Sequence, residues 1–428
     1  MKNSGIEWIG EIPDDWALIR FKDIFINRKE IAGTRSFLFD RLALTMNGVI
    51  KRDKDDSDGL QPKEFDGYQI IYENDFIFKM IDLQNISTSR VGLSPYTGLV
   101  SPAYIRFSPR KKGQYNLFVY YFLMSLYYNC VYNNLGGNGV RSALNATDMG
   151  QFLIPFPSTN TQIQIVSMIE NRCAAVERLI TNQQEQIEKL KEYKQSVISE
   201  AVTKGLDPSA PLKDSGIEWV GNIPTGWEVK RTKYVATSIF KGNGITKEDV
   251  VIDGDTPCLR YGEIYSKYDI AFRQCNTKTN KANLSVLQYF HYGDILFAGT
   301  GELVEEIGKN IVYLGEEECL AGGDIIVLRH KQNPAFLNYA LYAMCSQMQK
   351  SYGKAKLKVV HISAAEIGNI YIALPSIIEQ QYIAEYLDKK CAEIDKLISI
   401  KQQKIEKLQE YKKSLIYEYV TGKKQVLI

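Results

Sequence analysis

The sequence predicts an α+β fold in which two mixed α/β modules are joined by two long helices. The helices are expected to form an antiparallel intramolecular coiled coil with pseudo-twofold symmetry. Three observations predict this fold: a long internal repeat, two segments without Gly or Pro, and strand patterns between them. The repeat is considered first, because a missed repeat leads to the wrong fold.

The repeat consists of two pairs of matching segments. Residues 4–16 read SGIEWIGEIPDDW and residues 215–227 read SGIEWVGNIPTGW. Residues 187–194 read IEKLKEYK and residues 405–412 read IEKLQEYK. The stretches between these matches, about 25–150 and 236–368, share no obvious similarity. Two different inserts in one repeated frame suggest that the two modules recognise different targets.

The two segments without Gly or Pro, 161–203 and 377–421, are predicted to be long helices, and each follows a proline. Apolar residues recur in them at alternating spacings of three and four, which predicts a heptad seam. The seam residues are Val166, Ile169, Val176, Ile180, Ile187, Leu190, Val197, Leu387, Ile394, Ile398, Ile405, Leu408 and Leu415. Gln183 and Lys194 interrupt the first seam, and Lys401 and Lys412 interrupt the second at equivalent places. At about 1.5 Å per residue, each helix makes a rod of about 65 Å.

The two helices are expected to pair with each other, because their length and polar outer faces favour a coiled coil over ordinary core helices. Antiparallel pairing would place the two modules at opposite ends. The C-terminal VTGKK resembles VTKGL at 202–206, which leads into the second SGIEW segment. The end of the chain is therefore expected where it could lead into its own beginning.

These patterns predict four parts of the chain. They are a first module at 1–157, a long helix at 158–204, a second module at 205–375 with a linker at 205–214, and a second long helix with a tail at 376–428. Within the modules, 68–80 and 289–299 read as strand, turn and strand, with Asn-Asp or Gly-Asp at the turn. Later strands are expected at 102–109 and 322–330, and helices at 116–132 and 334–349.

Composition is that of an ordinary globular protein, with 45% hydrophobic and 24% charged residues. The net charge of +2 does not by itself indicate nucleic acid, although local basic patches can bind it. The seven scattered cysteines without a CxxC motif predict reduced thiols in a cytoplasmic protein. Neither a signal-peptide pattern nor an 18-residue apolar stretch is found, so no association with a membrane is expected.

Basic and polar loops are the candidate DNA contacts, because Lys and Arg neutralise phosphates while Arg and Asn can read base edges. The candidates are Lys51, Arg52, Lys54, Arg90, Asn138 and Arg141 in the first module, and Lys241, Asn243, Arg260, Tyr261, Lys354, Lys356 and Lys358 in the second. The last three would lie on one side of an extended segment. Solvated surface loops are the alternative for each of them.

Enzyme functions are expected to be absent. Asp294 to Gly301 mimics a loop that binds S-adenosylmethionine, and Asn333-Pro334-Ala335-Phe336 mimics the catalytic motif of adenine methyltransferases, but its second proline is missing. Neither a nuclease pattern nor a GxxxxGK[ST] phosphate loop is found. A coiled-coil adaptor with two protein-binding modules remains a second reading, since tyrosine-rich modules also suit protein interfaces.

The combination of motifs resembles the specificity subunits of type I restriction-modification enzymes over essentially the whole chain. The motifs are the doubled SGIEW-x-G-x-IP-x-x-W, the IPFP and IALP segments at 154–157 and 372–375, Glu379-Gln380, the doubled IEKL-x-EYK, and GLVSPAY at 98–104. One departure is Thr161-Gln162-Ile163-Gln164, which stands where the second helix has Glu-Gln.

The resemblance implies that each module is a target-recognition domain that reads one half of a bipartite, asymmetric site in double-stranded DNA. It implies that the helices set the spacer and recruit two methyltransferase (M) subunits, which bind S-adenosylmethionine and methylate adenine. Restriction (R) subunits that use ATP and Mg²⁺ would complete the complex. It also implies that this chain has no catalytic residue and binds no metal or cofactor.

Overall fold

The computed structural model describes residues 1–46, 48–55, 64–83, 89–111, 115–135, 143–284, 286–301, 303–354 and 360–425. The chain divides into two compact units. Unit 1 contains Met1–Gln183 together with Gln403–Ile428, and unit 2 contains Gln184–Gln402. Within the described residues, none of the helices combines the length and the apolar character needed to cross a bilayer.

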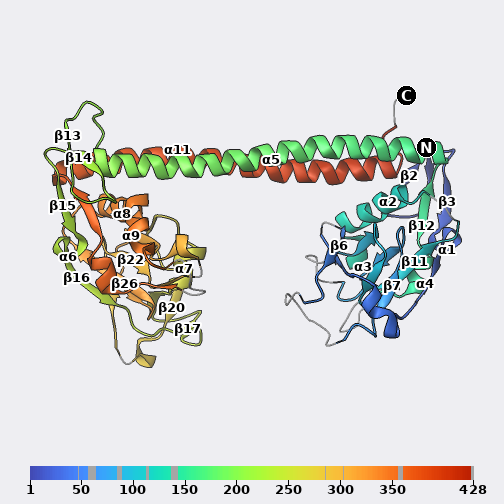
Figure 1. Ribbon diagram of the computed structural model, residues 1–428, viewed down its shortest axis with the longest axis horizontal. Helices are drawn as coiled ribbons and strands as arrows, with labels where there is room; N and C mark the ends of the chain where they lie inside the picture. The colour runs from blue at the N-terminus through green and yellow to red at the C-terminus, as the bar shows by residue number, and fades with distance from the viewer. Residues whose placement is uncertain are drawn as a thin grey trace. The chain divides into compact units, whose positions relative to one another are not determined.

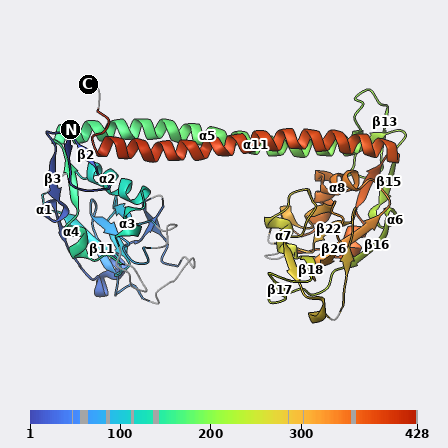
Figure 2. The same ribbon diagram turned by 180° about the vertical axis from the view of Figure 1, so that it is seen from behind.

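The two predicted long helices are confirmed as α5 (Thr159–Lys204) and α11 (Ile377–Val420). Their predicted seam residues are buried or half-buried. In each unit the segments of α5 and α11 run side by side in antiparallel orientation (Figure 1; Figure 2). Two contacts in unit 2 show the antiparallel direction. Gln186 of α5 accepts a hydrogen bond from Lys401 of α11, and the later Lys194 pairs with the earlier Asp395.

Unit 1 contains two four-stranded sheets. The helix-side sheet has the order β4-β11-β8-β9, and its phenylalanines share one core with α2 (Leu117–Tyr128) and both long helices. The outer sheet has the order β6-β5-β10-β7 and packs around a smaller apolar cluster. The strands are β4 (Phe25–Asn27), β5 (Arg41–Thr45), β6 (Gly48–Arg52), β7 (Gln69–Ile71), β8 (Phe76–Phe78), β9 (Val91–Leu93), β10 (Gly98–Val100) and β11 (Ile105–Pro109).

Unit 2 repeats this arrangement with five strands in each sheet. Its helix-side sheet has the order β16-β26-β22-β24-β19, and its outer sheet has the order β17-β20-β18-β25-β21. The helix α8 (Pro334–Tyr342) lies between the helix-side sheet and the long helices (Figure 1). The strands are β16 (Ala236–Lys241), β17 (Val250–Val251), β18 (Thr256–Leu259), β19 (Ala271–Phe272), β20 (Thr277–Thr279), β21 (Tyr289–Phe290), β22 (Ile295–Ala298), β24 (Asn310–Tyr313), β25 (Cys319–Ala321) and β26 (Ile325–His330).

The two divergent inserts therefore share one topology, which the sequence did not reveal. Pairing directions agree strand by strand: β10 is parallel to β5 as β25 is to β18, and the other equivalent pairs are antiparallel. The segments 68–80 and 289–299 are strand, turn and strand as predicted. Their two strands do not pair, however, because each turn carries the chain from the outer sheet to the helix-side sheet.

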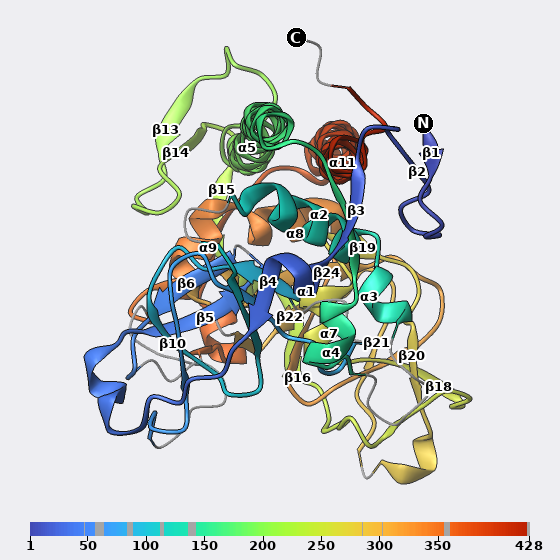
Figure 3. The ribbon, with the colours of Figure 1, turned by 90° about the vertical axis from the view of Figure 1, so that its right-hand side faces the viewer.

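Each SGIEW segment closes the C-terminal end of a long helix. In unit 1, β1 (Lys2–Asn3) and β2 (Glu11–Ile12) lie beside α11 (Figure 3), and the Tyr417 hydroxyl donates to the Trp8 carbonyl at 3.2 Å. Gly422, with φ +72°, leaves room for Pro13 and Trp16. In unit 2, β13 (Leu212–Asp214) and β14 (Asn222–Pro224) follow α5, and Gly205, with φ +78°, faces Trp227 in the same way.

The end of the chain therefore lies against its beginning, as the match between VTGKK and VTKGL predicted. Each unit is closed by a further strand pair that leads into its long helix. In unit 1, β3 (Ala17–Arg20) pairs with β12 (Leu153–Phe156), and in unit 2, β15 (Glu228–Arg231) pairs with β28 (Tyr371–Leu374). IPFP and IALP each cover the last three residues of β12 and β28 and the proline that follows the strand.

Candidate nucleic-acid interface

The outer sheet of unit 1 borders a hollow whose walls carry both basic and acidic side chains. It is lined by Phe37, Leu38, Phe39, Asp40, Arg41, Lys51, Arg52, Asp53, Lys54 and Asp55. Lys51 is exposed and lies 2.7 Å from Asp40, which holds the pKa of this lysine above its usual value through a hydrogen bond and charge. Lys54 donates to the Ser36 carbonyl at 2.9 Å. Three sequence-predicted candidates, Lys51, Arg52 and Lys54, are therefore brought together here.

Two apolar residues of this hollow were missed from the sequence. Phe37 and Leu38 end the short 3-10 helix Gly33–Leu38 and are 76% and 64% exposed. Exposed apolar side chains next to basic groups are typical of protein surfaces that stack on bases or insert a side chain between base steps. The signal in the sequence is the run of three apolar residues at 37–39 between Ser36 and Asp40, which strand and core patterns also produce.

The outer sheet of unit 2 borders a second hollow, at which the backbone of Gly242 lies close to the backbone of Ala321 and Gly322. Its lining residues are Lys241, Gly242, Gly244, Ile245, Thr246, Arg260, Tyr261, Gly322, Gly323 and Asp324. A Cβ on Gly242 would overlap the carbonyls of Ala321 and Gly322, so this contact between two loops requires glycine. Lys241 lies 3.2 Å from Asp324. Of the predicted residues, Lys241, Arg260 and Tyr261 line this hollow.

Asn243 is adjacent to the second hollow, and its side chain forms a hydrogen bond within the protein. Its backbone N–H donates to Ala321 at 2.9 Å, and its side-chain amide donates to the Val286 carbonyl. Asn243 therefore shapes the loop in this conformation.

Two other predicted contacts are corrected by the structure. Arg90 is 1% exposed, and its guanidinium donates to the carbonyls of Lys79, Ile81 and Asp82, so the prediction that it contacts DNA is wrong. Lys354 has a side chain only 13% exposed and forms a 2.7 Å ion pair with Glu366, so it is not the free phosphate contact that was predicted. Asn138, Arg141, Lys356 and Lys358 lie outside the described residues.

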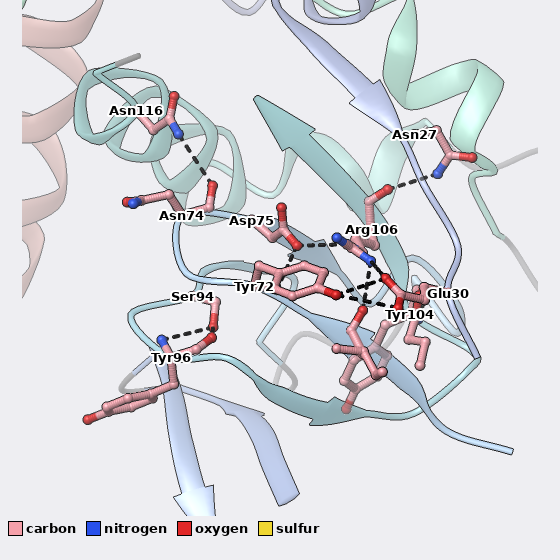
Figure 4. A network of polar contacts seen from close by, with 12 residues as sticks. Asn27, Glu30, Tyr72, Asn74, Asp75, Ser94, Tyr96, Tyr104, Arg106 and Asn116 are labelled. Carbon is pink, nitrogen blue, oxygen red and sulfur yellow. Dashed lines mark hydrogen bonds and ion pairs between the residues drawn. The ribbon is translucent and has the colours of Figure 1, made fainter. Parts of the chain in front are cut away.

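In unit 1 a polar network lies at the joint between the outer sheet and the helix-side sheet. Asp75 lies in the turn from β7 to β8, and its carboxylate accepts the backbone N–H of Tyr72 at 2.8 Å and Nε of Arg106 at 2.7 Å. Arg106 of β11 also donates from Nη1 to the Ile70 carbonyl of β7 at 2.7 Å. One guanidinium thus connects a helix-side strand, the turn and an outer-sheet strand (Figure 4).

Aromatic and acidic neighbours complete this network. The Arg106 guanidinium lies 5.0 Å from the centre of the Tyr72 ring, and Glu30 lies 3.8 Å from its Nη1. Burial tends to raise the pKa of Glu30, but hydrogen bonds from Arg35 and Tyr72 and the charges of Arg35 and Arg106 lower it below its usual value. Glu30 is therefore ionised beside a buried cation.

Unit 2 contains the same joint. Asp294 lies in the turn from β21 to β22, and its carboxylate accepts the backbone N–H of His291 at 3.0 Å and Nε of Arg329 at 3.1 Å. Arg329 of β26 donates from Nη2 to the Tyr289 carbonyl of β21 at 2.6 Å. Its guanidinium lies 5.1 Å from the centre of the Phe240 ring. Burial raises the pKa of Asp294 against the opposing effects of His291 and Arg329.

The segments that mimicked a methyltransferase have structural roles. Asp294 belongs to the joint between the sheets. Asn333 caps α8, because its Oδ1 accepts the backbone N–H of Phe336 at 2.9 Å. Among the described residues, no group of three or more His, Cys, Asp or Glu side chains could hold a metal ion.

Comparison with known proteins agrees with this architecture. The family model of the type I restriction modification DNA specificity domain matches the chain twice, at residues 13–189 and 224–410. The MjaVIII specificity subunit of a type I restriction enzyme from Methanocaldococcus jannaschii is 24% identical over 97% of this chain and 94% of its own length. The putative MjaX specificity subunit from the same organism is 25% identical over 98% of this chain and 96% of its own length.

A solved structure shows the same fold. It comes from work on complex assembly and conformational transition of the type I R-M system. The alignment has a TM-score of 0.67 at 15% identity and covers 96% of this chain and 98% of that one.

Proposed function

Since the chain belongs to the family of type I restriction-modification specificity subunits and carries two target-recognition modules, we propose that each module reads one half of a bipartite, asymmetric site in double-stranded DNA. Specificity subunits are the non-catalytic DNA-recognition components of these systems, and this chain is one of them. The observation that supports the proposal best is that both modules have one topology but different hollows on their outer sheets. Two different readers on one chain predict a non-palindromic site.

In this proposal the two hollows face DNA. Exposed Lys51 and Lys241 contact phosphates and set the register of the protein on the duplex, whereas Arg260 reads base edges. Both lysines sit next to a carboxylate, Asp40 or Asp324, at the surface. A phosphate can replace such an exposed partner at little cost, because surface ion pairs contribute only about 0–1 kcal/mol.

The partners proposed for the chain are two M subunits and, in the full complex, R subunits. The M subunits would bring S-adenosylmethionine and take the target adenine out of the base stack, and the R subunits would bring ATP and Mg²⁺. The polar outer faces of α5 and α11 are proposed to recruit the M subunits. The paired helices are proposed to act as a ruler that sets the spacer between the half-sites.

DNA binding as a function of salt tests this proposal against the adaptor reading. The full chain should bind a DNA duplex with an affinity that falls linearly in a log–log plot against salt, with a slope of about −0.9 per phosphate contacted. Lys51→Gln should reduce the slope by about one contact, whereas Lys191→Gln, which changes an exposed lysine of α5, should not. If the chain does not bind the duplex even at low salt, the proposal of DNA recognition is contradicted and the alternative of a protein-binding adaptor is favoured.

A further inference from the structure

The turn between the two sheets of each module is built in the same way in detail. Asn74 and Gly293 precede the aspartate and have positive φ, at 68° and 86°. Their backbone N–H groups donate to Ser94 at 2.7 Å and to Tyr313 at 2.8 Å. The carboxylate of the next residue accepts the N–H three residues before it, which closes the turn. The turn is thus a defined connection between the sheets and not a loose loop.

One arginine in each module then ties the turn to both sheets. Arg106 and Arg329 are on helix-side strands, and both donate to the turn aspartate and to a carbonyl on the adjoining outer-sheet strand. Their guanidinium groups also lie over an aromatic ring, Tyr72 or Phe240. Each arginine therefore connects its own helix-side strand to the turn and to an outer-sheet strand.

The two arginines reach this place from different positions in the strand. Phe107 pairs with Phe76, and Leu328 pairs with Ile295, and both partners directly follow the turn aspartate. Arg106 is thus one residue before the reference position, and Arg329 is one residue after it. Because side chains alternate between the two faces of a strand, both arginines lie on the same face. Ser108 takes the place of Arg329 in unit 1. The contact is kept although the residue that makes it is not in register.

We propose that Arg106 and Arg329 are positioning residues for DNA reading, each of which fixes the outer sheet, and with it the hollow, of one module. The inference rests on the proposed function, because it assigns the hollows to DNA. The path in unit 1 is short: Ile70 of β7 pairs with Leu99 of β10, which pairs with Arg41 at the wall of the hollow. In unit 2, Tyr289 pairs with Leu320, which pairs with Cys258, two residues before Arg260.

Loss of either arginine should relax base discrimination in one half of the DNA site and leave discrimination in the other half unchanged. A base-edge contact is directional, so a small rotation of the outer sheet weakens discrimination between bases more than it weakens contacts to phosphates. Variants that lack either arginine should lose stability, because a buried carboxylate loses its cation, but each module should still fold, because both sheets keep their apolar clusters. Arg106→Gln should thus relax only the half-site of module 1, and Arg329→Gln only that of module 2.

The experiment is a methylation map of DNA modified by the complete complex that contains wild-type chain, Arg106→Gln or Arg329→Gln. We expect methylation at sites with one base changed in a single half to rise about tenfold over wild type in each variant, in opposite halves for the two variants. Arg106→Lys and Arg329→Lys should restore part of the discrimination, because a cation near the aspartate is retained. Leu123→Ala and Leu341→Ala are the matched controls, since these residues of α2 and α8 are fully buried and their apolar side chains take no part in the hydrogen bonds of the joint.

The outcomes are distinct. Relaxed reading of opposite halves in the two arginine variants, without relaxation in the leucine controls of similar thermal stability, supports the inference. An unchanged motif, or a loss of all methylation that follows stability in arginine and leucine variants alike, overturns it. If the wild-type complex itself yields no bipartite motif, the proposed function fails instead.

Discussion

Lys194 of α5 donates to both carboxylate oxygens of Asp395 on α11, at 2.9 Å each. The pair has a counterpart in unit 1, where Lys412 of α11 binds Glu177 of α5. Lys412 lies 218 residues after Lys194, and Glu177 lies 218 residues before Asp395, which is the spacing of the IEKL repeat. The lysines that interrupt the heptad seams are therefore partners of the opposite helix.

The two lysines should differ in their contribution to stability. Lys194 has a side chain 8% exposed and is also bound to Asp269 at 3.0 Å, whereas the Lys412 side chain is 29% exposed. Lys194→Met should lower the free energy of unfolding by about 1–3 kcal/mol, and Lys412→Met by about 1 kcal/mol or less, because exposed pairs contribute little. Urea titration of the chain measures both. Lys191→Met is the control, and an equal loss for all three variants would contradict the prediction.

The contribution of Lys350 to the stability of unit 2 should increase as pH rises above neutrality. Lys350 is fully buried, donates to Asn310 Oδ1 and the Leu341 carbonyl at 2.7 Å each, and burial lowers its pKa to about 7. The unfolded chain keeps this lysine protonated up to about pH 10.4, so between pH 7 and that value unfolding takes up a proton. The free energy of unfolding should therefore rise with pH in this window, by at most about 1.4 kcal/mol per pH unit from this group.

Lys350→Met removes the titrating group and should flatten this part of the profile. Cys345 is the other titratable group that acts on Lys350, so Cys345→Ala should be included as a control. Thermal unfolding between pH 7 and pH 9 provides the comparison. A Lys350→Met chain with the same pH slope as wild type would show that Lys350 is not the source.

Phe37 should contribute to DNA affinity. It is 76% exposed and forms part of the hollow with Lys51 and Lys54. Burial of a Phe side chain contributes about 1.5–3 kcal/mol, so Phe37→Ala should weaken binding of a duplex about tenfold when DNA covers this ring. Tyr234→Ala is the matched control, because this aromatic residue on α6 (Thr232–Val235) is 72% exposed and lines neither hollow. Equal affinity of both variants would remove Phe37 from the interface.

Insertion of seven residues into both α5 and α11 should lengthen the required spacer. One heptad adds about 10 Å to a helix and preserves the seam, and a base pair of DNA rises about 3.4 Å. The half-sites should therefore move apart by up to about three base pairs, as read from a methylation map. The same insertion in α5 alone mismatches the paired seams and is the control for loss of assembly. An unchanged spacer in the double insertion would rule out the ruler.

The long helices could be predicted from the sequence because a heptad seam is a local pattern. Val166 and Leu415 are buried as expected, and even the interruptions at Lys194 and Lys412 marked real contacts. The turns at Asn74-Asp75 and Gly293-Asp294 were also found. The sequence did not show that each turn connects two different sheets, because strand propensity carries no information on which strand pairs with which.

The site was harder to predict, because exposure and partners depend on the tertiary fold. Arg90 follows a polar run and was read as a surface residue, yet three carbonyls bind it in the interior. Arg106 and Arg329 lie in segments that the sequence predicts only as strands, and no local pattern marks either arginine as a site residue. Their equivalence is one of contacts at positions that do not align, which no comparison of the two halves by residue could detect.

The central claim is that this chain selects the DNA sequence. It is tested most directly by a map of N6-methyladenine across the genome of a cell that carries this chain with its methyltransferase subunit, compared with a cell that lacks only this chain. A split, asymmetric motif with a fixed gap that disappears in the deletion is predicted. Methylation that stays unchanged when this chain is absent would contradict the claim.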